Sequence, residues 1–328
     1  MIDEVAQGIY RLGSVFGGRL LYVYLLKGEH HCVLIDSGAV VTPDEAIMPA
    51  LKRLACEPDT LIVTHCDLDH QGGNYKLKLA FPEMTLACGA GDEEQVSDPR
   101  VLVDRRYSAW EQDHGVGFPT EVKPKLVYLA GSNAVQVDRT FTGGERLQLS
   151  DDWTIEVLHL PGHSKGHLAI YDPRSNSAIT QDAVHGNDYP YADGRPWALM
   201  PTYYYIDPYL ETVERLRGMD VSTLHTAHWP VAEGAAVTQR LDETRDYTLK
   251  ADKVVFDLLE SGLTTLSEIM AEAMPRLGKW DPSTSGDFGC SMHGHLQRLV
   301  DSGIASVSRL EGLLRYAVAG DYSPPASS

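Results

Sequence analysis

The chain has 328 residues, of which 43% are hydrophobic and 23% are charged, a composition typical of a globular protein. Its formal net charge of −18 makes nucleic acid and anionic membrane surfaces poor partners, because both are polyanionic. No apolar run is long enough to span a membrane, and the N-terminus lacks the basic and apolar regions of a signal peptide. The five cysteines form no CxxC pair, which is typical of reduced thiols. These features predict a cytoplasmic protein that acts on a small molecule.

The first third of the chain is predicted to alternate strands with short helices. Apolar segments bounded by glycine, at 8–13 and 20–28, predict strands. A helix is expected over 42–55, where Thr42 is a suitable N-cap and a proline takes the first helical position. Residues 59–65 predict a buried strand that ends in a polar loop, and loops of this kind carry the chemistry of many α/β folds.

The middle of the chain returns to a β pattern after a mixed, partly helical stretch at 84–145. The expected elements that follow are strands over 144–162, two strands joined by a turn at Asp172–Ser177, a loop rich in tyrosine and proline at 186–208, an amphipathic helix at 208–219 and a strand over 221–230.

The character of the sequence changes after residue 233. Two helices are predicted over 234–262 and 264–278, followed by a helix and a two-strand wing that together resemble a winged-helix module. Residues 252–328 hold six Lys or Arg against ten Asp or Glu, so the module lacks the basic face of a nucleic-acid reader. It is expected to serve packing, pocket closure or formation of a homodimer.

Three regions are therefore expected: a catalytic domain over 1–232, a helical C-terminal domain over 233–320 and a disordered tail over 321–328.

Ligand-type side chains follow four of the predicted strands. The segment Thr64–Gly73, THCDLDHQGG, is the densest, and single residues of the same kind end three later strands. The set is His65, Asp67, Asp69 and His70, then His163, Asp182 and His228. Imidazole and carboxylate are ligands for Zn²⁺, Mn²⁺ and Fe. One histidine after a strand is usually structural, but four such loops indicate a metal centre.

The motifs HxDxDHxGG and PGHSxGH, followed by a lone Asp and a last His, resemble the metallo-β-lactamase family over roughly residues 5–232. The resemblance implies an α+β fold, a four-layer αβ/βα sandwich, with a small, mostly helical C-terminal domain. It also implies two metals at one edge, between the sheets. The implied ligands are His65, Asp67 and His163 for the first metal, Asp69, His70 and His228 for the second, and Asp182 as the bridge.

The same resemblance implies a dinuclear hydrolase. A metal-bridging hydroxide would attack a small ester, thioester, lactone or amide, and Asp69 would orient the water and accept its proton. Two divalent ions are expected, zinc first, with iron or manganese open because Asp67 replaces the family's usual histidine by a harder ligand.

Two other functions stay open at this point. Flavodiiron relatives carry a carboxylate at the position of Asp67, so a di-iron oxygen-binding or redox enzyme is the alternative; no flavodoxin-like or rubredoxin-like module is evident to supply electrons. A metal-binding module that has lost its activity is the third hypothesis, and the intact ligand set argues against it.

Several neighbours of the motifs are expected to act around the metals. Asp36 and His167 are expected to support the ligands through hydrogen bonds. His185, Tyr189 and Tyr191 are candidate substrate contacts, with a ligand-orienting or plain loop role as the alternative for His185 and a packed loop for the tyrosines. Cys66 is expected to point away from the metals, because its neighbours at 65 and 67 point toward them.

Overall fold

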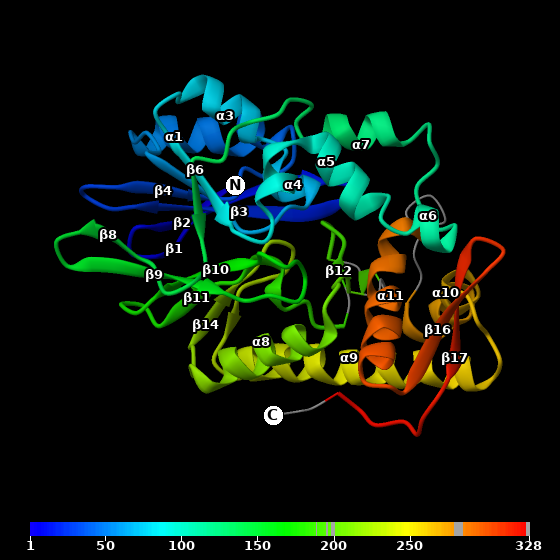
Figure 1. Ribbon diagram of the computed structural model, residues 1–328. Helices are drawn as coiled ribbons and strands as arrows, with labels where there is room; N and C mark the ends of the chain where they lie inside the picture. The colour runs from blue at the N-terminus through cyan, green and yellow to red at the C-terminus, as the bar shows by residue number, and fades with distance from the viewer. Residues whose placement is uncertain (188, 195, 198–200, 279–284, 326–328) are drawn as a thin grey trace.

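The computed structural model describes residues 1–187, 189–194, 196–197, 201–278 and 285–325. Two β-sheets packed face to face form its centre (Figure 1). The first sheet has the strands β1 (Ile2–Ala6), β2 (Ile9–Phe16), β3 (Arg19–Lys27), β4 (Cys32–Ile35), β5 (Thr60–Val63), β6 (Thr85–Gly89) and β7 (Arg139–Phe141), in that order. The second has, in spatial order, β15 (Ala232–Glu233), β14 (Thr223–His225), β11 (Ser177–Ile179), β10 (Leu168–Asp172), β9 (Trp153–His159) and β8 (Arg146–Ser150).

Strand β3 shows why these residues form a sheet that is buried on both faces. Val23 and Leu25 lie in the core under the outer helices, whereas Tyr24 and Leu26 lie in the core between the two sheets. All four side chains are fully buried. The period of two along a strand thus supplies both cores from one apolar run.

Helices cover the outer face of each sheet, which completes four layers (Figure 1). The covering elements of the first sheet are η1 (Pro43–Ile47), α1 (Met48–Leu54), α2 (Leu68–Gln71), α3 (Asn74–Ala80), α4 (Glu93–Ser97), α5 (Pro99–Leu102), η2 (Val103–Tyr107) and α7 (Lys123–Leu129). The short helix α6 (Glu111–His114) lies instead against the C-terminal part of the chain. Beneath the second sheet lie α8 (Ile206–Gly218) and the first part of α9 (Ala235–Glu260), whose Val213, Leu216 and Leu241 pack on it. The expected α+β sandwich is confirmed.

The helix expected over 42–55 forms, but Thr42 does not cap it. Thr42 itself has helical dihedral angles, φ −59° and ψ −36°, and its side chain makes no cap hydrogen bond. The hydroxyl instead lies 3.2 Å from that of Ser14 on β2. A tertiary contact has therefore replaced the local cap that the sequence predicts.

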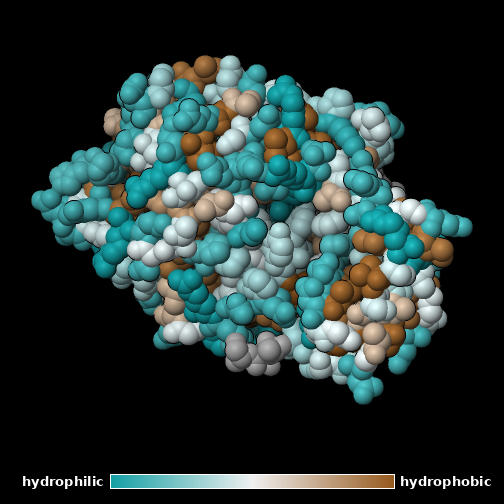
Figure 2. Space-filling model, in the orientation of Figure 1, coloured by the Kyte–Doolittle hydropathy of each residue, from teal (hydrophilic) through white to brown (hydrophobic). Residues whose placement is uncertain are grey.

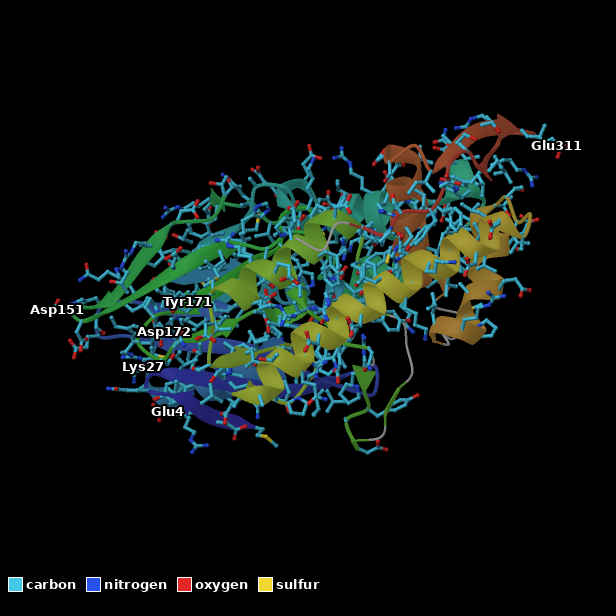
Figure 3. The ribbon with its side chains drawn as sticks, turned by 90° about the horizontal axis from the view of Figure 1, so that it is seen from below. Glu4, Lys27, Asp151, Tyr171, Asp172 and Glu311 are labelled. Carbon is cyan, nitrogen blue, oxygen red and sulfur yellow. The ribbon has the colours of Figure 1, made fainter. Side chains whose placement is uncertain are left out.

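The C-terminal part is a helical unit with its own core. It consists of the second half of α9, α10 (Leu266–Leu277), α11 (Ser285–Asp301) and the hairpin β16 (Ala305–Leu310)–β17 (Leu313–Val318). Residues that include Val255, Ile269 and Leu296 form this core. Helix α9 runs from beneath the second sheet into the helical unit without a break (Figure 3). A boundary at residue 233 stays a prediction, since one helix belongs to both cores.

The chain end differs from the expectation of a disordered tail from residue 321. The Tyr322 ring packs on Phe256, with 4.9 Å between ring centroids, and its hydroxyl donates to Asp252. Arg298 donates to the carbonyl of Ser323. These contacts leave no local sequence signal, because they join the tail to the distant helices α9 and α11; residues 326–328 lie outside the described part.

Polar side chains cover most of the face seen in Figure 2, and apolar ones gather over the helical unit at the lower right. Val307, Leu310 and Val318 of the hairpin are among the exposed large apolar residues. Within the described residues, the structure contains no helix with the length and apolar character needed to cross a bilayer.

Candidate metal centre

The loops that follow β5, β9, β11 and β14 converge at one edge of the sandwich. They bring together the seven ligand candidates that the sequence predicts: His65, Asp67, Asp69, His70, His163, Asp182 and His228. Six of these are buried and Asp67 is partly exposed. Strands β4, β5 and β6 pair in parallel, as do β11 and β14, so their carboxyl ends and the loops after them meet at the same edge.

The four histidines share one orientation. In each ring Nδ1 has a hydrogen-bond partner, which leaves Nε2 to face the centre. The partners are the Thr64 hydroxyl at 3.1 Å from His65, Asp36 Oδ2 at 2.8 Å from His70, the Thr202 carbonyl at 2.6 Å from His163 and the Leu20 carbonyl at 2.9 Å from His228. A proton on Nδ1 leaves a lone pair on Nε2, which is the form of histidine that binds a metal.

The second subsite lies around Asp182. Its Oδ2 is 3.6 Å from His70 Nε2 and 3.5 Å from His228 Nε2, and Asp69 Oδ2 is 3.4 Å from His228 Nε2. Ligands at about 2.1 Å from a tetrahedral metal are separated by roughly 3.4 Å, so these spacings fit one cation.

Unpartnered atoms support the same interpretation. Among the described residues, His65 Nε2, His70 Nε2 and Asp182 Oδ1 are buried without a hydrogen-bond partner. Buried polar atoms are rarely left unpaired, because desolvation is costly. Three acceptors that converge without a donor fit a site for metal ions.

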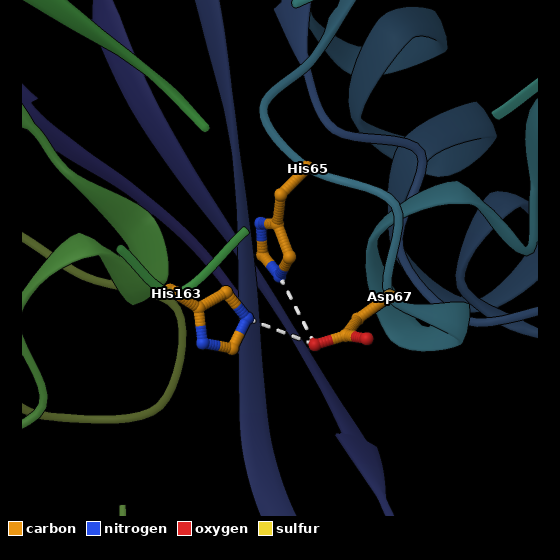
Figure 4. A group of neighbouring side chains, drawn as sticks. All are labelled: His65, Asp67 and His163. Atoms are coloured by element: carbon orange, nitrogen blue, oxygen red, sulfur yellow. Dashed lines mark hydrogen bonds and ion pairs between the residues drawn. The ribbon is translucent and has the colours of Figure 1, made fainter. Parts of the chain in front are cut away.

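The first subsite is shown in Figure 4, where His65 and His163 both point toward the same oxygen of Asp67. Asp67 Oδ2 is 3.6 Å from His65 Nε2 and 2.9 Å from His163 Nε2. A fourth group, which the sequence did not single out, also lies here: the guanidinium of Arg106 on η2 donates twice to Asp67. The sequence signal was the pair of arginines at 105–106, which does not say which of the two points inward.

The surroundings favour the ligand forms of Asp182 and His65, whereas, against the effect of burial, the carboxylates of Asp36 and Asp182 raise the pKa of His70 well above the usual value. Burial opposes a charge on Asp182, but the adjacent His228 and His70 hold the pKa of its carboxyl well below the usual value. Burial, followed by the neighbouring His70 and His163, holds the pKa of His65 well below that of a free histidine. An ionised carboxylate and a neutral imidazole are the states that coordinate metals.

Asp36 lies behind the centre and joins three of its segments. It accepts hydrogen bonds from the Thr64 backbone and hydroxyl, from His70 Nδ1 and from Gln181 Nε2. Asp36 and Gln181 have φ angles of 61° and 47°, in the left-handed region that costs free energy for residues other than glycine. His167 Nε2 donates to the Thr180 carbonyl at 3.1 Å, next to the Asp182 loop. Asp36 and His167 therefore lie where a supporting role was predicted for them.

The three candidate substrate contacts fall in different places. His185 is fully buried, and its Nε2 lies 3.5 Å from Asp182 Oδ2, so it belongs to the ligand cluster. Tyr191 is partly buried beside Gly18, whose carbonyl accepts a hydrogen bond from the Ala192 backbone at 2.8 Å. The side chain of Tyr189 lies outside the described part of the chain.

A pocket of about 520 Å³ opens beside the first subsite. Its lining includes Arg106, Trp110, Lys165, Tyr204 and Tyr205. Asp92, Glu93 and Glu94 belong to the same lining, so aromatic walls with charged groups of both signs suit an organic substrate that carries polar groups.

The model of one protein family matches residues 17–228, and its description is "Metallo-beta-lactamase superfamily". The chain belongs to this superfamily. The match spans all four ligand loops of the centre. Among solved structures, this superfamily member is similar in fold to a metallo-beta-lactamase family protein from Thermus thermophilus. The TM-score is 0.71 and the identity 18%, over 96% of this chain and 100% of that one.

The matches to curated relatives cover a smaller share of both chains. The chain is 28% identical to a hydroxyacylglutathione hydrolase from Synechococcus sp. over 62% of this chain and 65% of the relative. It is 26% identical to an acyl-coenzyme A thioesterase from Bos taurus over 65% of this chain and 74% of that protein. The matched region thus spans less than two thirds of the first of these relatives.

Proposed function

We propose that this superfamily member is a hydrolase that cleaves small thioesters with two divalent metal ions. The unpartnered acceptors His65 Nε2, His70 Nε2 and Asp182 Oδ1 are the observation that carries the metal part of the proposal. The names of the two curated relatives support the thioester part, since both describe hydrolases of thioesters.

The predicted ligands would be shared between two metal ions. The first metal would be held by His65, Asp67 and His163, the second by Asp69, His70 and His228, with Asp182 shared. Zinc suits the imidazole-rich set, and iron or manganese would also accept it. When bound, the two ions would supply hydroxide at neutral pH and stabilise negative charge on the attacked carbonyl.

Asp69 is the residue best placed to handle the proton of the attacking water. Its side chain is 11% exposed, and Oδ2 lies 3.4 Å from His228 Nε2 and 3.7 Å from an Arg19 nitrogen. From this position beside His228, Asp69 would orient the water and accept its proton.

The neighbouring pocket of about 520 Å³ offers room for the acyl or thiol part of the substrate. Lys165 would pair with a carboxylate or phosphate of glutathione or coenzyme A, and the ring of Trp110 would pack on its organic part. The acidic Asp92, Glu93 and Glu94 of the same lining would face its amide or amine groups. All five cysteines are free, which supports a reducing compartment such as the cytoplasm; a homodimer stays a prediction.

The di-iron alternative depends on the carboxylate at position 67, and that carboxylate is paired with Arg106. No observation on the described residues favours it over hydrolysis. Metal content and oxygen consumption separate the two functions.

The test is elemental analysis of unchelated protein combined with a thioester assay. We expect zinc as the main metal and release of free thiol from a hydroxyacyl-glutathione or an acyl-coenzyme A, with a slower reaction of the matching oxygen esters. The Asp182→Ala variant is the control for metal dependence. Iron-loaded protein that consumes oxygen and leaves every thioester intact would overturn the proposal.

A further inference from the structure

Arg106 lies inside the first subsite. Its side chain is 4% exposed, and its Nη2 atom lies 2.8 Å from Asp67 Oδ2 and 3.3 Å from His163 Nε2. Its Nε atom donates to the other oxygen of Asp67, so the guanidinium holds the carboxylate with both of its edge donors. Arg106 thus contacts two of the three predicted ligands of the first metal.

The chemistry of these two ligands requires a cation or a proton between them. Asp67 Oδ2 and His163 Nε2 are 2.9 Å apart, and His163 donates a hydrogen bond from Nδ1 to the Thr202 carbonyl. Both atoms are then acceptors, and two acceptors at this separation repel each other unless a donor is shared. The Arg106 guanidinium supplies such a donor to both atoms.

The cation beside the second subsite makes a looser contact: an Arg19 nitrogen lies 3.7 Å from Asp69 Oδ2, whereas Arg106 Nη2 lies 2.8 Å from Asp67 Oδ2. In the part of the chain that the structure describes, His70 Nε2 and Asp182 Oδ1 have no hydrogen-bond partner. The two subsites therefore differ in how closely a guanidinium contacts their ligands: Arg106 is within hydrogen-bond distance of two first-subsite ligands, whereas Arg19 stays 3.7 Å from one second-subsite ligand.

We propose that Arg106 competes with the first metal for Asp67 and His163, so that the two subsites differ in affinity. The second subsite holds its metal tightly. The first gains a metal only when the guanidinium leaves the carboxylate. The proposal rests on the two-metal centre proposed above and adds an order of loading and a residue that controls it.

When a metal displaces Arg106, its side chain can move toward the neighbouring pocket. Its guanidinium already lies over the Tyr204 ring, 4.2 Å from the ring centroid, and both residues line the pocket of about 520 Å³. A rotation of the side chain would keep the stacking contact while it moves the charge toward this pocket. The Tyr107 hydroxyl, 3.1 Å from Asp67 Oδ1, would remain to hold the freed carboxylate.

The experiment compares Zn²⁺ binding by the full-length wild type, Arg106→Gln and Arg105→Gln, by calorimetric titration and by zinc per chain after dialysis against a weak chelator. Arg105 is the matched control, because it lies on the same helical turn, is 58% exposed and pairs with Glu94. We expect the wild type and Arg105→Gln to keep about one zinc, and Arg106→Gln to keep about two, with first-site affinity raised by about 10–100-fold.

Equal retention in all three proteins would overturn the proposal, as would a loss of zinc from Arg106→Gln, which would make Arg106 a support of the site. If Arg106→Gln does not fold, Arg106→Lys keeps the charge without the two-pronged contact. It should bind the first zinc more tightly than the wild type, and an unchanged affinity would overturn the proposal.

Failure of the proposed function has a different signature. Zinc retention that follows Arg106, together with no thioester cleavage by any two-zinc form, would reject thioester hydrolysis and leave the role of Arg106 in place. Thioester cleavage without any effect of Arg106 on zinc retention would support the proposed function and reject the role of Arg106.

Discussion

The molecule contains two buried clusters built from the same three residue types. At the edge of the sandwich, Asp67 contacts His163 and Arg106. In the helical unit, Asp252 of α9 contacts His295 and Arg298 of α11. Composition alone does not distinguish them, and both carboxylates bind an arginine.

Partners of the remaining polar atoms separate the two clusters. Asp252 Oδ1 accepts from His295 Nδ1 at 3.0 Å, its Oδ2 accepts from Arg298 and Tyr322, and His295 Nε2 lies 3.0 Å from the Tyr203 hydroxyl. This network is closed and joins four segments of the fold. The sandwich cluster adjoins acceptors without donors, so it can take up cations whereas the helical one cannot. The comparison teaches that unpaired acceptors which converge within one cluster, rather than histidine and aspartate as such, mark the functional site.

Asp182→Ala should have the largest effect, because Asp182 is shared by the two predicted subsites. We expect thioester turnover to fall by more than the roughly 10–100-fold that loss of a supporting residue causes. Zinc per chain should fall as well, while the circular dichroism spectrum is kept. A variant that still holds both metals would remove Asp182 from the bridging position.

Asp252→Ala should instead change stability. Its removal leaves His295 and Arg298 buried without their carboxylate, and we expect a loss of about 3–5 kcal/mol in the free energy of unfolding. Zinc per folded chain should not change. Asp257→Ala on the same helix is the control, since its exposed pair with Lys253 contributes less than about 0.5 kcal/mol. Loss of zinc from Asp252→Ala would mean that the helical cluster acts on the metal centre.

Asp67→His restores the imidazole that is usual in the family, but it also leaves Arg106 buried without its partner. We therefore expect the double variant Asp67→His/Arg106→Gln to bind zinc at the first subsite roughly tenfold more tightly than the wild type, measured by competition with a chelator. Asp67→Ala/Arg106→Gln is the control that lacks a ligand at position 67. Equal zinc retention by the two double variants would count against position 67 as a ligand.

The sequence predicted the sandwich and the ligand loops because their signals are local. The apolar run before His65 and the turn glycines after His70 lie within a few residues of the ligands themselves. The capping box of α10, in which Thr265 accepts from the Glu268 backbone and the Glu268 carboxylate accepts from the Thr265 backbone, is local as well.

What the sequence could not supply depends on contacts between distant segments. Arg106 lies 39 residues from Asp67 along the chain, and Asp92 lies 74 residues from Gly166, whose backbone donates to it at 2.8 Å. Neither pairing leaves a periodic or spaced pattern. The predicted cap at Thr42 does not form for the same reason, because its hydroxyl contacts Ser14 on the distant strand β2.

His293 of α11 and His114 of α6, which packs against the helical unit, should make stability depend on pH. Burial, then the adjacent His114, lowers the pKa of His293 to about 4, and burial also lowers the pKa of His114. The unfolded chain therefore binds more protons than the folded one between about pH 6.5 and 4, and stability falls as the pH falls through that window.

His293→Phe keeps a ring against Trp110, on which His293 stacks with 4.2 Å between ring centroids, and removes the titrating group. We expect the wild type to lose about 1 kcal/mol more than this variant between pH 7 and pH 5, after allowance for partial exposure. Thermal unfolding at both pH values gives the comparison, because any loss of metal at low pH affects both proteins. Parallel curves would show that His293 does not titrate in this range.

Cys66→Ala should have the smallest effect, although Cys66 lies between two predicted ligands. Its side chain is fully buried in the core under the outer helices, and burial raises the pKa of its thiol well above the usual value. We expect thioester turnover within about twofold of the wild type and a stability loss of about 1 kcal/mol for the lost sulfur contacts. Zinc per chain and thermal unfolding provide the check. If Cys66→Ala lost zinc, nearness in sequence to the ligands would matter as much as unpaired acceptors do, and the distinction drawn between the two buried clusters would fail.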